Sequence, residues 1–198
     1  MGIELTPAPM EIELTVNGER VRERIEPREL LLDFLRERLR LTGAKRSCDV
    51  QVCGTCTVLV DGGPVSACTY LAADADGREV LTIEGFAARP EFGRFEQAFM
   101  RHAALQCGYC TPGLLLTLKR LLDAGELRDE RDIRHGLDGN LCRCTGYRSI
   151  LEAARELAGE PDGSSQELSR LAGEGAGAAG EVAGAAGEAA GAAGEAHA

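Results

Sequence analysis

The stretch KRSCDVQVCGTCTVLVDGGPVSAC, residues 45–68, combines a cysteine motif with a strand–turn–strand pattern. Its cysteines follow the spacing C-x4-C-x2-C-x11-C and are Cys48, Cys53, Cys56 and Cys68. A C-x4-C-x2-C run with one more distant cysteine is the plant-type spacing of a [2Fe–2S] site. The turn residues DGG separate TVLV from PVS, which predicts a β-hairpin that brings the fourth cysteine back toward the other three.

The residues before this stretch predict a second hairpin and one helix. In EIELTVNGERVRERI (11–25), apolar residues alternate up to Asn17-Gly18, the residue pair of a type I′ turn. Pro27 is expected to open a helix that Gly43 ends. The leucines of this helix recur at intervals of four and are Leu31, Leu35 and Leu39. After the cysteine stretch, EVLTI (79–83) is a further strand candidate.

Hairpin, helix and further strands describe a small α+β sheet domain, residues 10–84, with a helix across one face. From about residue 85 to 159 the pattern becomes helical. RFEQAFMRHAAL (94–105) places two phenylalanines four residues apart, and Thr111-Pro112 is expected to be the N-cap and first residue of a helix that Gly125 ends. Two further helices are expected, over 129–136 and over SILEAARELA up to Gly159.

Four more cysteines lie in this helical segment. Cys107 and Cys110 form a C-x2-C pair, and Cys142 and Cys144 form a C-x-C pair. Residues two apart in an extended chain point to the same side, about 6.6 Å from each other. That is a tight span for a disulfide, but it suits two side chains that converge on a third object. Two such pairs from separate loops can close a four-thiolate cage.

Zinc and disulfides are the alternatives to iron–sulfur clusters. Four thiolates also suit zinc, whose structural sites usually combine two C-x2–4-C pairs. The first set fits that arrangement poorly, whereas the second set taken alone fits either metal. MGIELTPAPMEIEL (1–14) has no basic start and no apolar core of a secretory signal. We therefore expect a reducing, cytoplasmic location, where structural disulfides are rare.

A [2Fe–2S] cluster held by four thiolates is an anion, and its burial has to be compensated. Backbone N–H groups should therefore point at the sulfurs, and glycines allow the chain to approach closely. Glycines next to or near the cysteines are Gly54, Gly108 and Gly146. A helix that starts at Thr111-Pro112 would also point its N-terminus toward Cys110. Arg143 is either a charge partner of the cluster or a solvated arginine.

The net charge of −10 and the pI of about 4.9 argue against nucleic acid or an anionic membrane as partner. No apolar run approaches the roughly 18 residues of a membrane-spanning helix. Within residues 160–198, AGAAGE recurs every seven residues, starting at Ala176, Ala183 and Ala190. Two glycines per repeat cost about 2 kcal/mol of helix propensity, which favours a flexible Gly/Ala/Glu low-complexity tail over a coiled coil.

Three motifs together resemble the two-cluster [2Fe–2S] small subunit of the molybdenum hydroxylases, the family of xanthine dehydrogenase, aldehyde oxidoreductase and carbon monoxide dehydrogenase. They are KRSCDVQVCGTCTVLVDGGPVSAC (45–68), LQCGYCTPG (105–113) and GNLCRCTGYRSI (139–150), and the match covers roughly residues 10–158. The resemblance implies a β-grasp, ferredoxin-like domain followed by a four-helix bundle. It also implies that the two cysteine sets bind two separate [2Fe–2S] clusters.

The resemblance further implies an electron-transfer subunit with no substrate site of its own. The second cluster would lie near a molybdopterin cofactor in a large subunit, and the first toward FAD in a medium subunit. Such complexes would be dimers of heterotrimers. Gln106 matches the glutamine that hydrogen-bonds the pterin in this family. No glycine-rich phosphate loop follows a strand, so no flavin or nicotinamide is expected in this chain.

The chain departs from the family pattern at three positions. Asp49 and Gln51 replace the usual glycines of the first loop, and Tyr109 stands where phenylalanine is common. Two other functions stay open: a free-standing two-cluster ferredoxin, and a structural or regulatory module that binds zinc. His102 and His135 are weaker ligand candidates, because both cysteine sets are complete without them.

Overall fold

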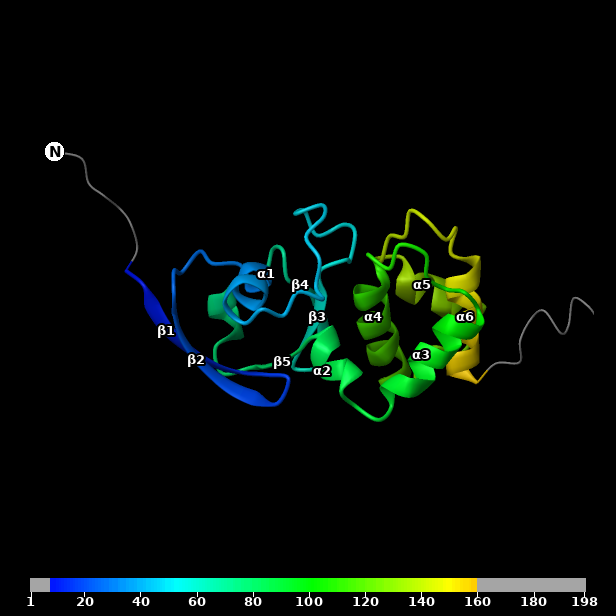
Figure 1. The fold of residues 1–198 in the computed structure, drawn as a ribbon, viewed down its shortest axis with the longest axis horizontal. Helices are drawn as coiled ribbons and strands as arrows, with labels where there is room; N and C mark the ends of the chain where they lie inside the picture. The colour runs from blue at the N-terminus through cyan, green and yellow to red at the C-terminus, as the bar shows by residue number, and fades with distance from the viewer. Residues whose placement is uncertain (1–7, 160–198) are drawn as a thin grey trace, which may run out of the picture. The chain divides into compact units, whose positions relative to one another are not determined.

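The computed structural model describes residues 8–159 and contains a five-stranded sheet followed by a helical part (Figure 1). The strands are β1 (Met10–Val16), β2 (Glu19–Ile25), β3 (Thr57–Val60), β4 (Gly63–Ser66) and β5 (Glu79–Leu81). Their order in the sheet is β2-β1-β5-β3-β4, with β1 and β5 parallel and the other neighbours antiparallel. The tail predicted over residues 160–198 lies outside the described residues.

Both predicted hairpins are confirmed. Strands β1 and β2 pair antiparallel around Asn17 and Gly18, whose φ angles of 53° and 89° are those of a primed turn. Strands β3 and β4 pair around Asp61 and Gly62, which also have positive φ angles. The hairpin stretch within residues 45–68 therefore folds as its pattern predicts.

The helix after β2 is much shorter than the sequence predicted. It consists of α1 (Leu31–Asp33) and a π-helical turn, η1 (Phe34–Arg38), so the prediction of a helix from Pro27 to Gly43 is wrong at both ends. Residues before α1 pair with another part of the chain instead. Leu30 forms a β-bridge with Leu71, and the next backbone N–H, of Leu31, donates to the Tyr70 carbonyl at 2.8 Å.

The C-terminal end of this helix is set by a hydrogen bond and a backbone conformation that do not belong to an α-helix. Leu41 N–H donates to the Leu35 carbonyl at 2.9 Å, and Arg40 between them has a φ of 60°. The left-handed residue ends the helix three residues before Gly43. Gly43 itself packs closely against Ile83, where a side chain would collide.

The remaining elements are helical. They are the 3-10 turn η2 (Ala72–Ala75) and the helices α2 (Ile83–Ala87), α3 (Phe92–Arg101), α4 (Thr111–Asp123), α5 (Glu130–Leu137) and α6 (Arg148–Ala158). The predicted strand 79–83 is shorter than expected, because β5 ends at Leu81 and Ile83 begins α2. The N-cap of α4 is Cys110, one residue before the predicted Thr111. Gly125 and Gly159 are left-handed and follow α4 and α6, as predicted.

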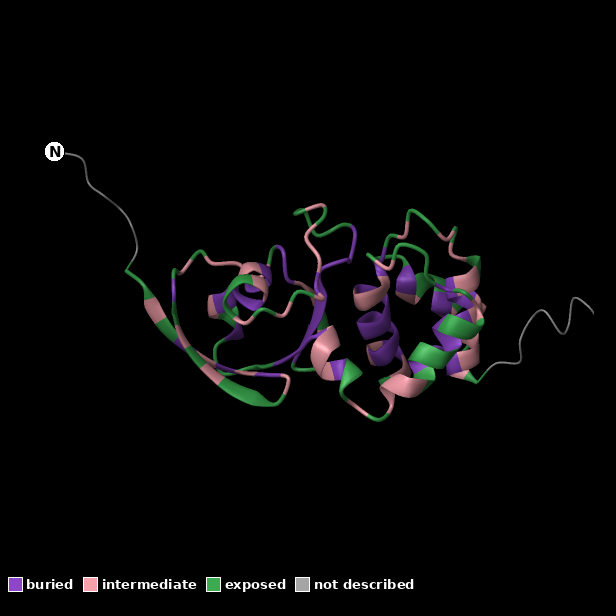
Figure 2. Cartoon of the chain, in the orientation of Figure 1, coloured by how far each residue is buried: buried purple, intermediate pink, exposed green. Residues whose placement is uncertain are grey.

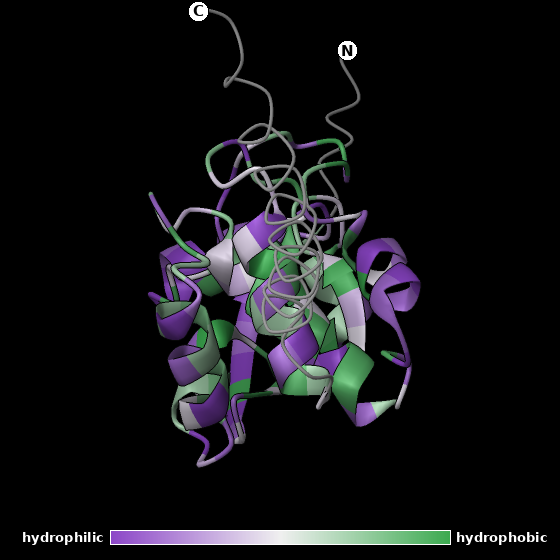
Figure 3. Ribbon diagram, turned by 90° about the vertical axis from the view of Figure 1, so that its right-hand side faces the viewer, coloured by the Kyte–Doolittle hydropathy of each residue, from purple (hydrophilic) through white to green (hydrophobic). Residues whose placement is uncertain are grey.

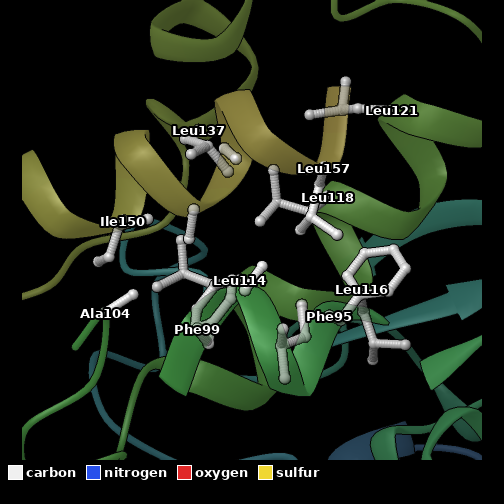
Figure 4. Packing of buried hydrophobic residues seen from close by; sticks show 14 of the residues in the cluster. Phe95, Phe99, Ala104, Leu114, Leu116, Leu118, Leu121, Leu137, Ile150 and Leu157 are labelled. Carbon is white, nitrogen blue, oxygen red and sulfur yellow. The ribbon is translucent and has the colours of Figure 1, made fainter. Parts of the chain in front are cut away.

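Helices α3 and α5 each bury one face and expose the other, whereas α4 is buried at every residue from Gly113 to Lys119 (Figures 2 and 3). Phe95 and Phe99 of α3 point toward Leu114 of α4 and Ile150 of α6 (Figure 4). The same buried cluster includes Leu59 of β3, so the sheet and the helices share part of one core. Between residues 8 and 159, no helix has the length and apolar character needed to cross a bilayer.

Candidate iron–sulfur centres

The first four candidate ligands gather at the open end of the β3–β4 hairpin. Cys56 directly precedes β3, and one residue separates Cys68 from the end of β4. Because Thr57 pairs with Ser66, the hairpin register brings these two thiols to the same end. The loop that leads into β3 supplies Cys48 and Cys53. Cys53, Cys56 and Cys68 are buried, whereas Cys48 is partly exposed.

The chain around Cys48 favours a thiolate. Backbone N–H groups of Val52 and Cys53 donate to Cys48 Sγ at 3.5 and 3.4 Å. The backbone N–H of Val50, together with those of Val52 and Cys53, lowers the pKa of Cys48 to about 6. At Cys56 the opposite holds, because burial raises the pKa to about 12. A nearby metal cation would reverse that effect and hold the Cys56 sulfur as a thiolate.

Asp49 and Gln51 take over the backbone conformation expected of glycine. Their φ angles are 54° and 58°, in the left-handed region. The Asp49 carboxylate accepts a hydrogen bond from Arg46 at 2.6 Å, and Gln51 Oε1 accepts one from Thr69 Oγ1 at 3.4 Å. These side-chain contacts stabilise a loop that bends as a glycine loop would.

The second four cysteines come together in pairs from two loops. The α3–α4 loop carries Cys107 and Cys110, and the α5–α6 loop carries Cys142 and Cys144. The Sγ atoms of Cys107 and Cys144 lie 3.5 Å apart, and the thiol of Cys110 contacts that of Cys142. Each pair takes one thiol from each loop. The Cys107–Cys144 pair is exposed, whereas the Cys110–Cys142 pair lies deeper.

The deeper pair has the donors that an anionic cluster needs. Burial opposes ionisation of Cys142, but the hydroxyl and the backbone N–H of Thr145 donate to its Sγ at 3.1 and 3.4 Å, and the net effect lowers its pKa. Burial raises the pKa of Cys110 to about 12. Cys110 is also the N-cap of α4, where the free N–H groups and the helix dipole favour negative charge.

The arrangement of the thiols suits a two-iron cluster. Within residues 8–159, no three Cys, His, Asp or Glu side chains converge closely enough to hold a metal ion as they stand. A zinc ion needs four donors about 2.0–2.3 Å from one point. A [2Fe–2S] cluster is larger and spreads four thiolates over two irons. In the second set, thiols that meet in pairs across two loops suit a cluster in which each iron takes two thiolates.

The other residues that the sequence singled out differ in exposure and in their contacts. Gln106 and Arg143 are exposed, and the Gln106 side chain makes no hydrogen bond within the part of the chain that the structure describes. Helix α3 ends at Arg101, so this side chain does not cap it. His102 Nε2 lies 2.8 Å from a Glu156 carboxylate oxygen and links α3 to α6, while His135 is 90% exposed.

Two residues that the sequence did not single out hold the second loop in place. Tyr147 accepts a hydrogen bond from the Cys142 backbone N–H at 2.8 Å and donates to the Asn140 carbonyl at 3.4 Å. Asn140 is only 4% exposed, and its side chain donates to the Gly54 carbonyl at 3.1 Å. Their place beside the C-x-C pair was the only sequence signal for them.

Comparison with known families gives two adjacent matches. A model described as "2Fe-2S iron-sulfur cluster binding domain" matches residues 14–82, and one described as "[2Fe-2S] binding domain" matches residues 82–155. Each match contains one of the two four-cysteine sets. Fold and sites thus define the class: an iron–sulfur protein with two [2Fe–2S] domains.

Individual relatives define the family. The chain is 44% identical to the caffeine dehydrogenase subunit gamma of Pseudomonas sp. (strain CBB1), over 74% of this chain and 90% of the relative. It is 43% identical to the xanthine dehydrogenase iron-sulfur-binding subunit of Escherichia coli O157:H7, over 71% and 89%. A chain in the crystal structure of quinoline 2-oxidoreductase from Pseudomonas putida 86 matches with a TM-score of 0.71 and 41% identity, over 76% and 93%. The protein belongs to the iron–sulfur small subunits of the xanthine dehydrogenase family of molybdenum hydroxylases.

Proposed function

We propose that the chain relays single electrons from a molybdopterin site in a large partner subunit, through two [2Fe–2S] clusters, to FAD in a medium partner subunit. The observation that carries this proposal is the presence of two complete four-cysteine sets whose loops contact each other directly. The relatives support it, because they are named as subunits of dehydrogenases and oxidoreductases. A free-standing ferredoxin has no use for the exposed Gln106 beside its second cluster.

The proposal assigns four cysteines to each cluster. Cys48, Cys53, Cys56 and Cys68 would hold the first, and Cys107, Cys110, Cys142 and Cys144 the second. We assign the first cluster to a β-grasp domain, residues 10–84, and the second to a helical domain, residues 85–159, in which α3 to α6 form a four-helix bundle. The register of β3 and β4 and the pairing of thiols across the α3–α4 and α5–α6 loops support these assignments.

Each cluster, when bound, accepts and releases one electron at a time, which is chemistry that the cofactor supplies. The chain's own residues position it and tune its surroundings. The N–H groups of Val52 and Cys53 and the hydroxyl of Thr145 compensate negative charge on sulfur. Burial of Cys53, Cys56, Cys68 and Cys110 restricts access of water to the reduced state.

The exposed parts of the two loops are where we place the partner subunits. Cys107, Cys144 and the free amide of Gln106 would face the subunit that carries molybdopterin. Val50 and Val52, which are 65% and 57% exposed in the first loop, would face the subunit that carries FAD. We further propose a dimer of heterotrimers that works in the cytoplasm.

Purification of the chain from its native cells tests this function. We expect it to co-purify with one chain that carries molybdenum and one that carries flavin. A chain that purifies alone with both clusters would support the free-standing ferredoxin. A chain that contains zinc and no iron would support the structural module.

Replacing Gln106 with leucine should weaken the link between the second cluster and the molybdenum site. The substitution keeps the approximate volume and removes the donor and acceptor that suit a pterin edge. A lost buried hydrogen bond costs about 1–3 kcal/mol. We expect substrate to reduce the second cluster about tenfold more slowly in the complex, or molybdenum content to fall, while both clusters assemble. Rapid mixing and metal analysis measure these quantities.

Gln97→Leu is the matched control, because Gln97 is exposed on α3. It should leave the reduction rate and the molybdenum content unchanged. Equal behaviour of the two variants would show that Gln106 has no part in the coupling.

A further inference from the structure

The first cysteine loop contacts the loop before Cys142 along a short stretch, which we call the seam. On one side it contains Cys53 and Gly54 of the first loop. On the other side it contains Gly139, Asn140 and Leu141, which directly precede Cys142. Figure 1 shows both loops at the same edge of the molecule, the first in cyan and the second in yellow.

Two hydrogen bonds cross the seam. The Leu141 N–H donates to the carbonyl of Cys53 at 2.9 Å, and Asn140 Nδ2 donates to the carbonyl of Gly54 at 3.1 Å. The hydrogen bond between Leu141 and Cys53 joins residues that belong to, or directly adjoin, candidate cluster ligands. Its acceptor belongs to a candidate ligand of the first cluster, and its donor belongs to the residue bonded to Cys142. One hydrogen bond therefore connects the two candidate ligand sets through the backbone.

Close backbone packing surrounds these bonds. A side chain at Gly54 would collide with the Gly139 carbonyl, and a side chain at Gly113 of α4 would collide with the Gly54 carbonyl. Gly113 lies three residues after Cys110, so the seam also touches the other loop of the second site. Neither loop can shift along the other without breaking these contacts.

Asn140 joins the two loops of the seam by a side-chain hydrogen bond, and Tyr109 makes a second link between the cysteine loops, because its hydroxyl donates to the Arg46 carbonyl. Asn140 is 4% exposed. Its backbone belongs to the second loop, because its N–H donates to Leu137 and its carbonyl accepts from the Tyr147 hydroxyl. Its carboxamide reaches the first loop. The Gly54 carbonyl would keep Thr57 as a donor without it, so the Asn140 bond is not required to satisfy that carbonyl.

We propose that Asn140 is a positioning residue that fixes the separation of the two clusters. The inference rests on the proposed function. Rates of electron transfer between fixed centres fall exponentially with their separation, so a residue that holds two cluster loops in register controls the rate without contacting either cluster.

The test compares Asn140→Asp with the native protein in the cluster-loaded complex. The aspartate has the same shape but presents an oxygen where Nδ2 donated, so attraction to the Gly54 carbonyl becomes repulsion. We expect unchanged iron content, a weaker magnetic interaction between the two reduced clusters in EPR spectra, and transfer between them slower by about tenfold or more. Unchanged interaction and rate would overturn the proposal.

Asn17→Gly is the matched control. Asn17 also joins distant segments through its side chain, to Thr82 at 2.8 and 2.9 Å, and glycine accepts its positive φ. It should lower stability and leave the magnetic interaction unchanged. If Asn140→Asp loses iron, the magnetic interaction and the transfer rate are measured on Asn140→Ala instead. Hydrogen exchange at the Leu141 amide is then the third measurement. Faster exchange with unaltered interaction and rate would show a purely structural role.

The native spectrum separates this inference from the function on which it rests. If the native complex lacks two cluster signals, the proposed function fails. If it shows both signals and Asn140 variants leave their interaction unaltered, only the positioning role fails.

Discussion

Cys56→Ser is expected to remove one of two cluster signals and leave the other, and Cys142→Ser is expected to do the reverse. Iron–sulfur clusters prefer soft thiolate ligands, and a serine oxygen is a hard replacement. Cys56 is 2% exposed, and the structure describes no unused cysteine that could take its place. Each variant should therefore lose about half of its iron, since each four-cysteine set holds one cluster.

EPR spectra of the reduced variants, with iron analysis, measure this outcome. The two substitutions serve as controls for each other, because the same chemical change is made in the sheet part and in the helical part. If both variants lost the same signal, our division of the cysteines into two sets would be wrong. If one variant lost both signals, the two sites would depend on each other for assembly.

Gly54→Ala is expected to destabilise the protein by about 2–5 kcal/mol, which combines a left-handed backbone with a collision. Gly54 has a φ of 68°, a conformation that costs a residue with a Cβ about 1–2 kcal/mol. The new methyl group would also meet the backbone of Gly139 and the side chain of Asn140. A rigid backbone cannot move aside as the end of a flexible side chain can, so overpacking adds about 1–3 kcal/mol.

Gly62→Ala is the control that separates the effect of the collision from that of the left-handed backbone. Gly62 has a φ of 78°, close to that of Gly54, but nothing lies within 4 Å of an added Cβ. Gly62→Ala should lower the free energy of unfolding only by the backbone contribution of about 1–2 kcal/mol. Denaturant unfolding of both variants gives the difference, which is the contribution of the seam. Equal destabilisation by the two substitutions would show that the loops are not in close contact at Gly54.

Short-range patterns in the sequence predicted much of the fold. Asn17-Gly18 predicted its turn because few residue pairs accept two positive φ angles, and the structure has them there. Phe95 and Phe99 predicted the buried face of α3 by their spacing, and both are 1% exposed. The assignment of the eight cysteines rested on spacing and on the family, and it stays a prediction until a cluster is observed.

The errors came where distant segments compete for the same backbone groups. Pro27 and the leucine spacing indicated a long helix, but the Leu30–Leu71 bridge occupies the chain before Leu31. No local pattern contains that information. Asn140 escaped notice for the same reason, because its partner Gly54 is 86 residues away in the sequence. Asp49 and Gln51 replace the usual glycines of the first loop, and the sequence alone did not show that they keep a left-handed backbone, which their contacts with Arg46 and Thr69 support.

We conclude that this one chain binds two [2Fe–2S] clusters. Iron and acid-labile sulfide, measured per chain in fully loaded protein, test it most directly. Two complete four-cysteine sets predict about four iron and four sulfide per chain. Two iron and two sulfide per chain, or zinc in place of iron, would contradict the account.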